Sequence, residues 1–135
     1  MTLKKGLFHF IRMTLAITYF WVVADRLGFL GPAGNVGVVW GDFDKFLEYT
    51  ATLNPWFPRG LSDFLGYVVT IVEVILGILL ISNNFIKYAS LASVLLLIIF
   101  TLSMTFSLGI TEAYDFIIFT VILGIGSGIL YKMSL

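Results

Sequence analysis

Four long apolar segments divide the chain, and they constrain its fold more than any other feature. They cover approximately residues 7–30, 61–82, 86–108 and 114–131. Each is close to the ~20 apolar residues that a helix needs to cross the hydrocarbon core of a bilayer. A soluble domain of 135 residues, 59% hydrophobic and 12% charged, could not bury so much apolar surface. The sequence therefore predicts an all-α membrane protein, a bundle of four transmembrane helices that forms a single domain over residues 1–135.

The charged residues sort to the two ends of these segments and predict the orientation of the bundle. One end carries only basic residues: Lys4, Lys5, Arg12, Lys87 and Lys132. The other end carries mostly acidic residues: Asp25, Asp42, Asp44, Glu48, Asp63, Glu112 and Asp115, with Arg26, Lys45 and Arg59. Because basic residues favour the cytoplasmic side, we expect both termini in the cytoplasm of a multi-pass cell-membrane protein, in the plasma membrane or, in a bacterium, the inner membrane. The lipid bilayer is its first partner, and a formal net charge of zero gives no indication of nucleic acid binding.

The long outer connection, residues 31–60, is expected to contain a short amphipathic helix. Its apolar residues recur at helical spacing while its charged residues lie elsewhere around the helix. These apolar positions are Phe43, Phe46, Leu47, Thr50 and Leu53. Asp42 is placed to cap the helix, and Pro55 follows its end. The helix either lies on the outer membrane surface as an anchor or folds over the mouth of the bundle as a lid.

Glu73 stands near the middle of the second apolar segment and is the most unusual residue in the chain. A charged side chain at the centre of a bilayer costs about 2.5–3.5 kcal/mol on insertion scales unless it finds a partner. At ~1.5 Å per residue, Arg12 lies ~9 Å and Glu73 ~13–14 Å from the cytoplasmic end of their helices. We therefore expect Arg12 and Glu73 to pair in the bundle interior. The pair would either hold the helices together or form a catalytic or ligand site.

Three further polar residues are candidates for binding a cofactor or substrate. Tyr19 lies in the middle of the first apolar segment, and Thr70 precedes Glu73 by three residues and could hydrogen-bond to it. Asp25 and Arg26 border the outer loop and could form the mouth of a site. As neighbours in a helix they do not face each other, so we expect each to pair elsewhere.

Some classes of site are disfavoured by the sequence. The chain has no cysteine, which excludes disulfides and thiolate ligands from this chain. His9 has no second histidine or carboxylate at metal-ligand spacing, so no metal site is expected. Residues Gly124 to Gly128 contain a Gly-x-x-x-Gly pattern, which permits close helix packing either within the bundle or in a homodimer.

Several local patterns resemble the DoxX family of small four-helix membrane proteins. They are Arg12 early in the first segment, Asp25-Arg-Leu-Gly at its end, the Trp40-Gly-Asp-Phe loop with its Leu53-Asn-Pro, and Glu73-Val-Ile-Leu-Gly-Ile-Leu-Leu. The resemblance implies a link to membrane redox systems, because DoxX relatives include a subunit of thiosulfate:quinone oxidoreductase. Quinone is then a possible cofactor, and a second membrane or redox subunit is a possible partner.

Three functional hypotheses follow. The first is a subunit of a quinone-linked membrane redox system, with Arg12 and Glu73 as the reacting pair and Tyr19, Thr70 and Asp25 around the ligand. The second is a non-catalytic scaffold or assembly factor that binds a partner helix. The third is a transporter of small solutes, which would need an oligomer because four helices leave little lumen.

Overall fold

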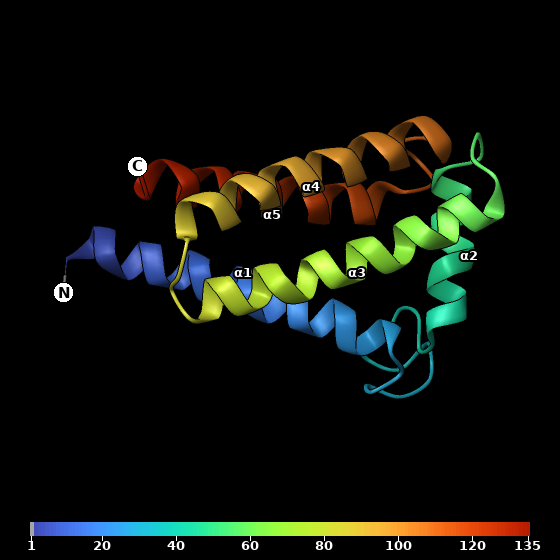
Figure 1. Ribbon diagram of the computed structural model, residues 1–135, viewed down its shortest axis with the longest axis horizontal. Coiled ribbons are helices and arrows are strands. Elements are labelled where there is room, and N and C mark those ends of the chain that lie inside the picture. Colours follow the sequence, from blue (N-terminus) through green and yellow to red (C-terminus); the bar gives the residue numbers. More distant parts are fainter. Residues whose placement is uncertain (1) are drawn as a thin grey trace.

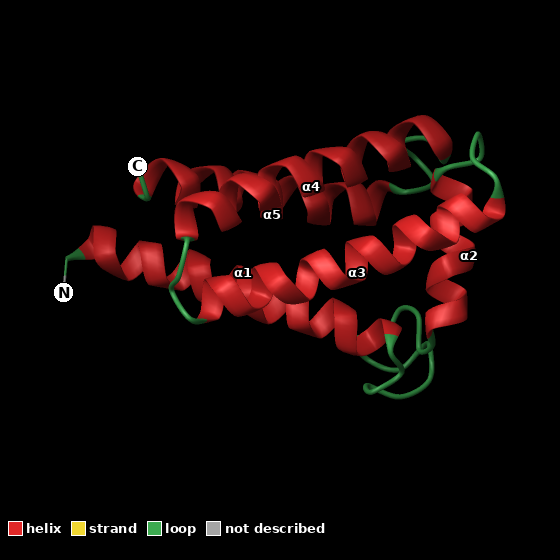
Figure 2. Ribbon diagram, viewed as in Figure 1, coloured by secondary structure: helices red, strands yellow, loops and turns green. Residues whose placement is uncertain are grey.

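The computed structural model of the protein describes residues 2–135, and within this range it contains helices and connecting loops (Figure 2). Four helices are long and apolar enough to cross a membrane: α1 (Leu3–Arg26), α3 (Arg59–Ile81), α4 (Ile86–Ser107) and α5 (Tyr114–Met133). The shorter α2 (Phe43–Leu53) lies between α1 and α3. Both ends of the chain lie at the same end of the bundle (Figure 1). The four-helix membrane bundle predicted from the sequence is confirmed, while its orientation in the membrane stays a prediction.

The first helix begins and ends four residues earlier than the apolar pattern predicts. The side chain of Thr2 accepts a hydrogen bond from the Lys5 amide, so the helix can start before the apolar run. At the other end Gly28 adopts a left-handed conformation with φ of +83°, which is a common way to end a helix. The helix therefore stops at Arg26, before residue 30, where the apolar segment ends.

The helix in the outer loop is α2, and it folds over the mouth of the bundle rather than lying apart from it. Asp42 caps it by accepting a hydrogen bond from the Lys45 amide at 2.8 Å, as predicted. Its apolar face is buried: Phe46, Leu47, Thr50 and Leu53. Gly66 of α3 lets the two helices approach closely, because a Cβ at this position would lie 2.6 Å from Cδ2 of Leu47.

The four long helices form a ring in which α1 contacts α3 and α5, and α4 contacts α5 and α3. In Figure 1, α1 and α3 form one antiparallel layer and α4 and α5 the other. The end of the ring nearest the termini is closed by a compact apolar core. Its most deeply buried members are Leu15, Ala16, Leu76, Leu80, Ala89 and Leu130. The opposite end, beneath α2, contains a smaller apolar cluster of Leu53, Met104, Ala113 and Ile117, and the candidate site lies beside it.

Candidate functional site

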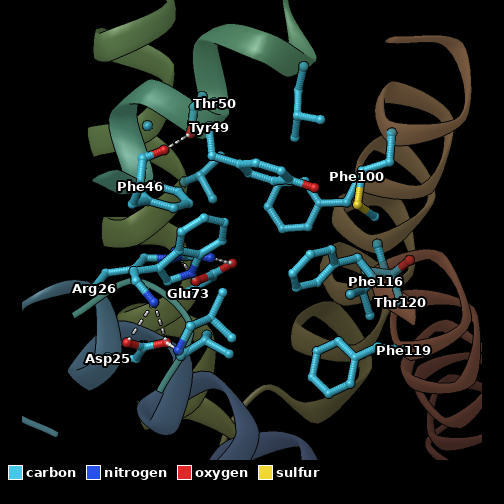
Figure 3. Close-up of a pocket in the computed structure, with 18 of the residues that line it drawn as sticks. Asp25, Arg26, Phe46, Tyr49, Thr50, Glu73, Phe100, Phe116, Phe119 and Thr120 are labelled. Carbon is cyan, nitrogen blue, oxygen red and sulfur yellow. Dashed lines mark hydrogen bonds and ion pairs between the residues drawn. The ribbon is translucent and has the colours of Figure 1, made fainter. Parts of the chain in front are cut away.

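A cavity of about 490 Å³ lies between the two helix layers in the outer half of the bundle. All five helices and the loop before α2 contribute to its walls. Most of the lining is apolar, and aromatic rings are prominent: Trp21, Trp40, Phe46, Tyr49, Phe100, Phe116 and Phe119. Figure 3 shows the α4 and α5 aromatics facing Arg26 and Glu73 across this space. Natural small-molecule sites are typically cavities of ~300–1,000 Å³ with apolar walls and a few polar groups, and this cavity matches that description.

The polar groups of the cavity centre on an ion pair between Arg26 and Glu73. Nη1 of Arg26 lies 2.5 Å from Oε2 of Glu73, and Nη2 lies 3.3 Å from Oε1, so the contact is bidentate. Both side chains are almost completely buried, with 7% and 2% of their surface exposed. The guanidinium also lies 3.9 Å from the ring centre of Phe46, where a cation–π contact stabilises it further. The buried carboxylate that the sequence marked out therefore has a charged partner.

The expected pairing of Arg12 with Glu73 is wrong. Nη1 of Arg12 instead donates to the backbone oxygens of Leu80 and Ile81, at 2.5 and 2.9 Å. These oxygens belong to the last turn of α3, where a helix lacks backbone donors and favours a positive charge. His9 is beside it, with Nδ1 3.2 Å from Nη2 of Arg12. Arg12 thus caps a helix end and does not line the cavity.

The reason for this error lies in the direction of helical side chains. In an α-helix the Cα–Cβ bond leans toward the N-terminus. Because α1 and α3 are antiparallel, Arg26 leans from the outer end of α1 toward the bilayer centre, while Glu73 leans outward to meet it. Arg12 leans away from Glu73, toward the opposite end. Depth counted along the helix axis does not include this difference in side-chain direction, which favours Arg26 over Arg12 as the partner of Glu73.

Asp25 and Arg26 pair with different elements, as the sequence predicts for helix neighbours. The carboxylate of Asp25 accepts hydrogen bonds from the backbone amides of Val39, Trp40 and Gly41 at 2.9, 3.1 and 3.0 Å. Only 3% of Asp25 is exposed. Figure 3 shows this carboxylate turned to the loop backbone, below the Arg26–Glu73 pair. Asp25 lines the cavity, but its oxygens are occupied by the chain itself.

Tyr19 and Thr70 both lie close to the ion pair. Tyr19 lines the cavity and is 3% exposed, and its buried hydroxyl has no hydrogen-bond partner within residues 2–135. Thr70 was predicted to hydrogen-bond to Glu73, but it has other partners. Its hydroxyl donates to the backbone oxygen of Gly66 at 2.9 Å and lies 3.4 Å from Nη1 of Arg26. Thr70 therefore supports the arginine.

Trp40, which was not among the predicted site residues, joins its own loop to α2 and α5 at the roof of the cavity. Its ring contacts Phe46 and Tyr49 of α2, with centroids 5.7 and 4.7 Å apart. It also lies nearly parallel to Phe116 of α5, at 6.2 Å. Burial raises the pKa of the Tyr49 phenol above its ordinary value, so this group is neutral at physiological pH. The roof is thus an uncharged aromatic cluster, although acidic residues surround α2.

Fold and site together define a multi-pass membrane protein with a buried ion pair in an aromatic cavity. The described residues contain no group of three or more histidine and acidic side chains placed to hold a metal ion. The model of one protein family, described as "Methylamine utilisation protein MauE", matches residues 4–115. This match covers most of the chain, from α1 to the start of α5, and the chain therefore belongs to the MauE family.

This family assignment corrects the resemblance to DoxX proteins drawn from the sequence, which was wrong. The patterns behind that resemblance were short, and several lie in apolar segments, whose residue types recur among membrane helices because bilayer insertion selects them. No curated protein matches the chain significantly, and no solved structure does.

Proposed function

We propose that this chain is the ligand-binding subunit of a membrane redox system, and that its outer-half cavity takes a small apolar ring compound of the quinone class. The observation that carries the proposal is the position of the Arg26–Glu73 pair, which is buried yet forms part of the wall of an aromatic cavity. A pair that served only to hold α1 against α3 would not need a cavity beside it. We further propose that this redox system takes part in methylamine utilisation, which the family description names.

The polar groups suit a ring that carries an oxygen. The buried Tyr19 hydroxyl makes no hydrogen bond of standard geometry within the described chain, and Tyr19 and Glu73 both line the cavity. We propose that Tyr19 donates a hydrogen bond to the ligand oxygen, and that the Glu73 carboxylate accepts a proton from a quinol hydroxyl while a redox partner protein withdraws the electrons from the ring. Arg26, which also donates to the Thr70 hydroxyl, holds the Glu73 carboxylate in place for that transfer. The aromatic walls would pack against the ring faces, where offset stacking is favourable.

A titration with a short-tailed benzoquinone tests this proposal. Quinones quench tryptophan fluorescence on contact, and two of the three tryptophans, Trp21 and Trp40, line the cavity. The expected result is saturable quenching in the wild type, superimposed on a linear contribution from Trp56 and from the exposed part of Trp21. In the double variant Arg26→Met/Glu73→Leu only the linear contribution should remain. Saturable quenching of equal affinity in both proteins would refute the proposal.

A non-catalytic scaffold or assembly factor is the second candidate. The observation that favours it is an apolar groove of about 390 Å³ on the α4–α5 pair, lined by residues that include Ile98, Leu102, Val121 and Ile125. A partner helix that purified stoichiometrically with the chain, with no small molecule, would support this alternative. The transporter hypothesis is less favoured, because Leu80 and Leu130, both fully buried, block the inner half of the bundle.

A further inference from the structure

Asp25 makes an unusual use of a buried carboxylate. Its two oxygens receive three successive backbone amides of the outer loop, from Val39 to Gly41. Hydrogen bonds to an ionised acceptor are among the stronger ones in proteins. The carboxylate therefore fixes the backbone of the loop onto the end of α1, just where the chain turns to enter α2.

The residue at the centre of this contact is Trp40. Its amide binds Asp25, while its side chain forms part of the cavity wall and contacts both α2 and α5. The loop that carries Trp40 is also held to α1 by Trp21, whose indole N–H donates to the Gly37 oxygen at 2.9 Å. The position of the Trp40 ring thus depends on a carboxylate that is itself turned away from the cavity centre.

We infer that Asp25 is a positioning residue, which acts on the bound ligand through Trp40 by fixing the aromatic roof of the cavity. This inference rests on the proposed function, because it specifies how the same cavity is shaped. It departs from a direct binding role for Asp25, since the loop amides already occupy its oxygens. It also assigns a different task to each of two adjacent residues, the roof to Asp25 and the ion pair to Arg26.

The first test measures how firmly the loop backbone is held, with no ligand present. Hydrogen exchange of the peptide that spans residues 36–42 is compared between the full-length wild type and Asp25→Asn, both in lipid nanodiscs. Loss of hydrogen bonds to a charged acceptor should speed exchange of the Val39–Gly41 amides by at least about 10-fold. Asp42→Ala is the matched control, because it removes the side-chain cap of α2 while leaving the Asp25 contacts in place. Unchanged exchange in Asp25→Asn would overturn the inference, whatever any ligand does.

The second test is a double-mutant cycle with the short-tailed benzoquinone as probe. Asp25→Asn and Trp40→Leu should each weaken probe binding about 5-fold, the loss expected when one aromatic contact is withdrawn. If Asp25 acts through Trp40, the double variant binds no more weakly than Trp40→Leu alone. If Asp25→Asn folds poorly, Asp25→Glu replaces it, because it keeps the charge but moves it by one methylene. The same pattern of affinity losses is expected, with a smaller loss for Asp25→Glu than for Asp25→Asn.

The outcomes separate the two proposals. Additive losses in the cycle would mean that Asp25 acts independently of Trp40 and would overturn this inference alone. A wild type that shows no saturable binding, with rapid exchange confined to Asp25→Asn, would refute the proposed ligand while leaving the loop-anchoring role intact. An Asp42→Ala control that loses as much affinity as Asp25→Asn would show a general effect of loosening α2, and would also overturn the inference.

Discussion

Removing one charge of the buried ion pair should destabilise the bundle far more than removing both. Arg26→Met leaves the Glu73 carboxylate buried among apolar side chains, and breaking such a pair typically costs about 3–5 kcal/mol. The alternative for the carboxylate is to take up a proton. At pH 7 that step costs an ordinary glutamate about 4 kcal/mol, at 1.36 kcal/mol per pH unit. The two costs are similar, so we expect Arg26→Met to lower the free energy of unfolding by about 4 kcal/mol.

The second half of the prediction concerns Glu73→Leu and the double variant. Glu73→Leu leaves the guanidinium with only Phe46 and Thr70, and should cost a similar amount. In Arg26→Met/Glu73→Leu no buried charge remains, and apolar replacements of buried ion pairs are often neutral. We therefore expect the double variant to lie within about 2 kcal/mol of the wild type, that margin including the lost cation–π contact.

Reversible unfolding in mixed bicelles, followed by circular dichroism, measures these free energies. The matched control is the exposed pair of Arg59 and Asp63, which has a similar contact distance of 2.7 Å. Because water and ions screen exposed charges, Arg59→Met should leave the unfolding free energy almost unchanged. Additive losses in the double variant, or single losses no larger than the control, would refute the view that the Arg26–Glu73 pair is a desolvated, mutually dependent contact.

Three further predictions concern the lid, the roof and the helix cap. Gly66→Ala places a Cβ 2.6 Å from Leu47 and should loosen α2, which raises the rate of hydrogen exchange in α2. Gly128→Ala is the control, because its Cβ meets nothing within 4 Å and should leave that rate unchanged. Because burial raises the pKa of Tyr49 above 10.0, the unfolded chain ionises first as pH rises. Stability should therefore fall above pH 10, and Tyr49→Phe should remove part of that fall in alkaline unfolding curves. Arg12→Met should lower the free energy of unfolding by about 1–2 kcal/mol, because α3 loses its C-terminal cap. The affinity for benzoquinone in the quenching titration should stay unchanged.

The transmembrane architecture could be predicted from the sequence because bilayer thickness sets the length of each apolar segment. The outer helix could also be predicted, since Asp42 and the spacing of Phe46 and Thr50 are local signals. A local signal also explains why the first helix ends earlier than predicted. Gly28 offered a left-handed residue before Gly31 did, and the first helix ended at the earlier opportunity.

The candidate site could be predicted only in part. Glu73 was recognisable because a carboxylate within an apolar segment demands a partner, whereas the choice of Arg26 over Arg12 depends on side-chain direction in an antiparallel pair. The partners of Asp25 are backbone amides, which every residue possesses, so no side-chain pattern announces them. The aromatic roof arises from packing between α2 and α5, which lie far apart in the chain.

The small-molecule content of the purified protein tests the central claim most directly. The protein is extracted from its own membrane in mild detergent, and bound compounds are released and identified by liquid chromatography and mass spectrometry. We predict a ring compound of the quinone class at near one-to-one stoichiometry in the wild type, absent from a folded Arg26→Met/Glu73→Leu variant. Equal amounts of that compound in both proteins, or only lipid in the wild type, would contradict the assignment of the Arg26–Glu73 cavity as a ligand site.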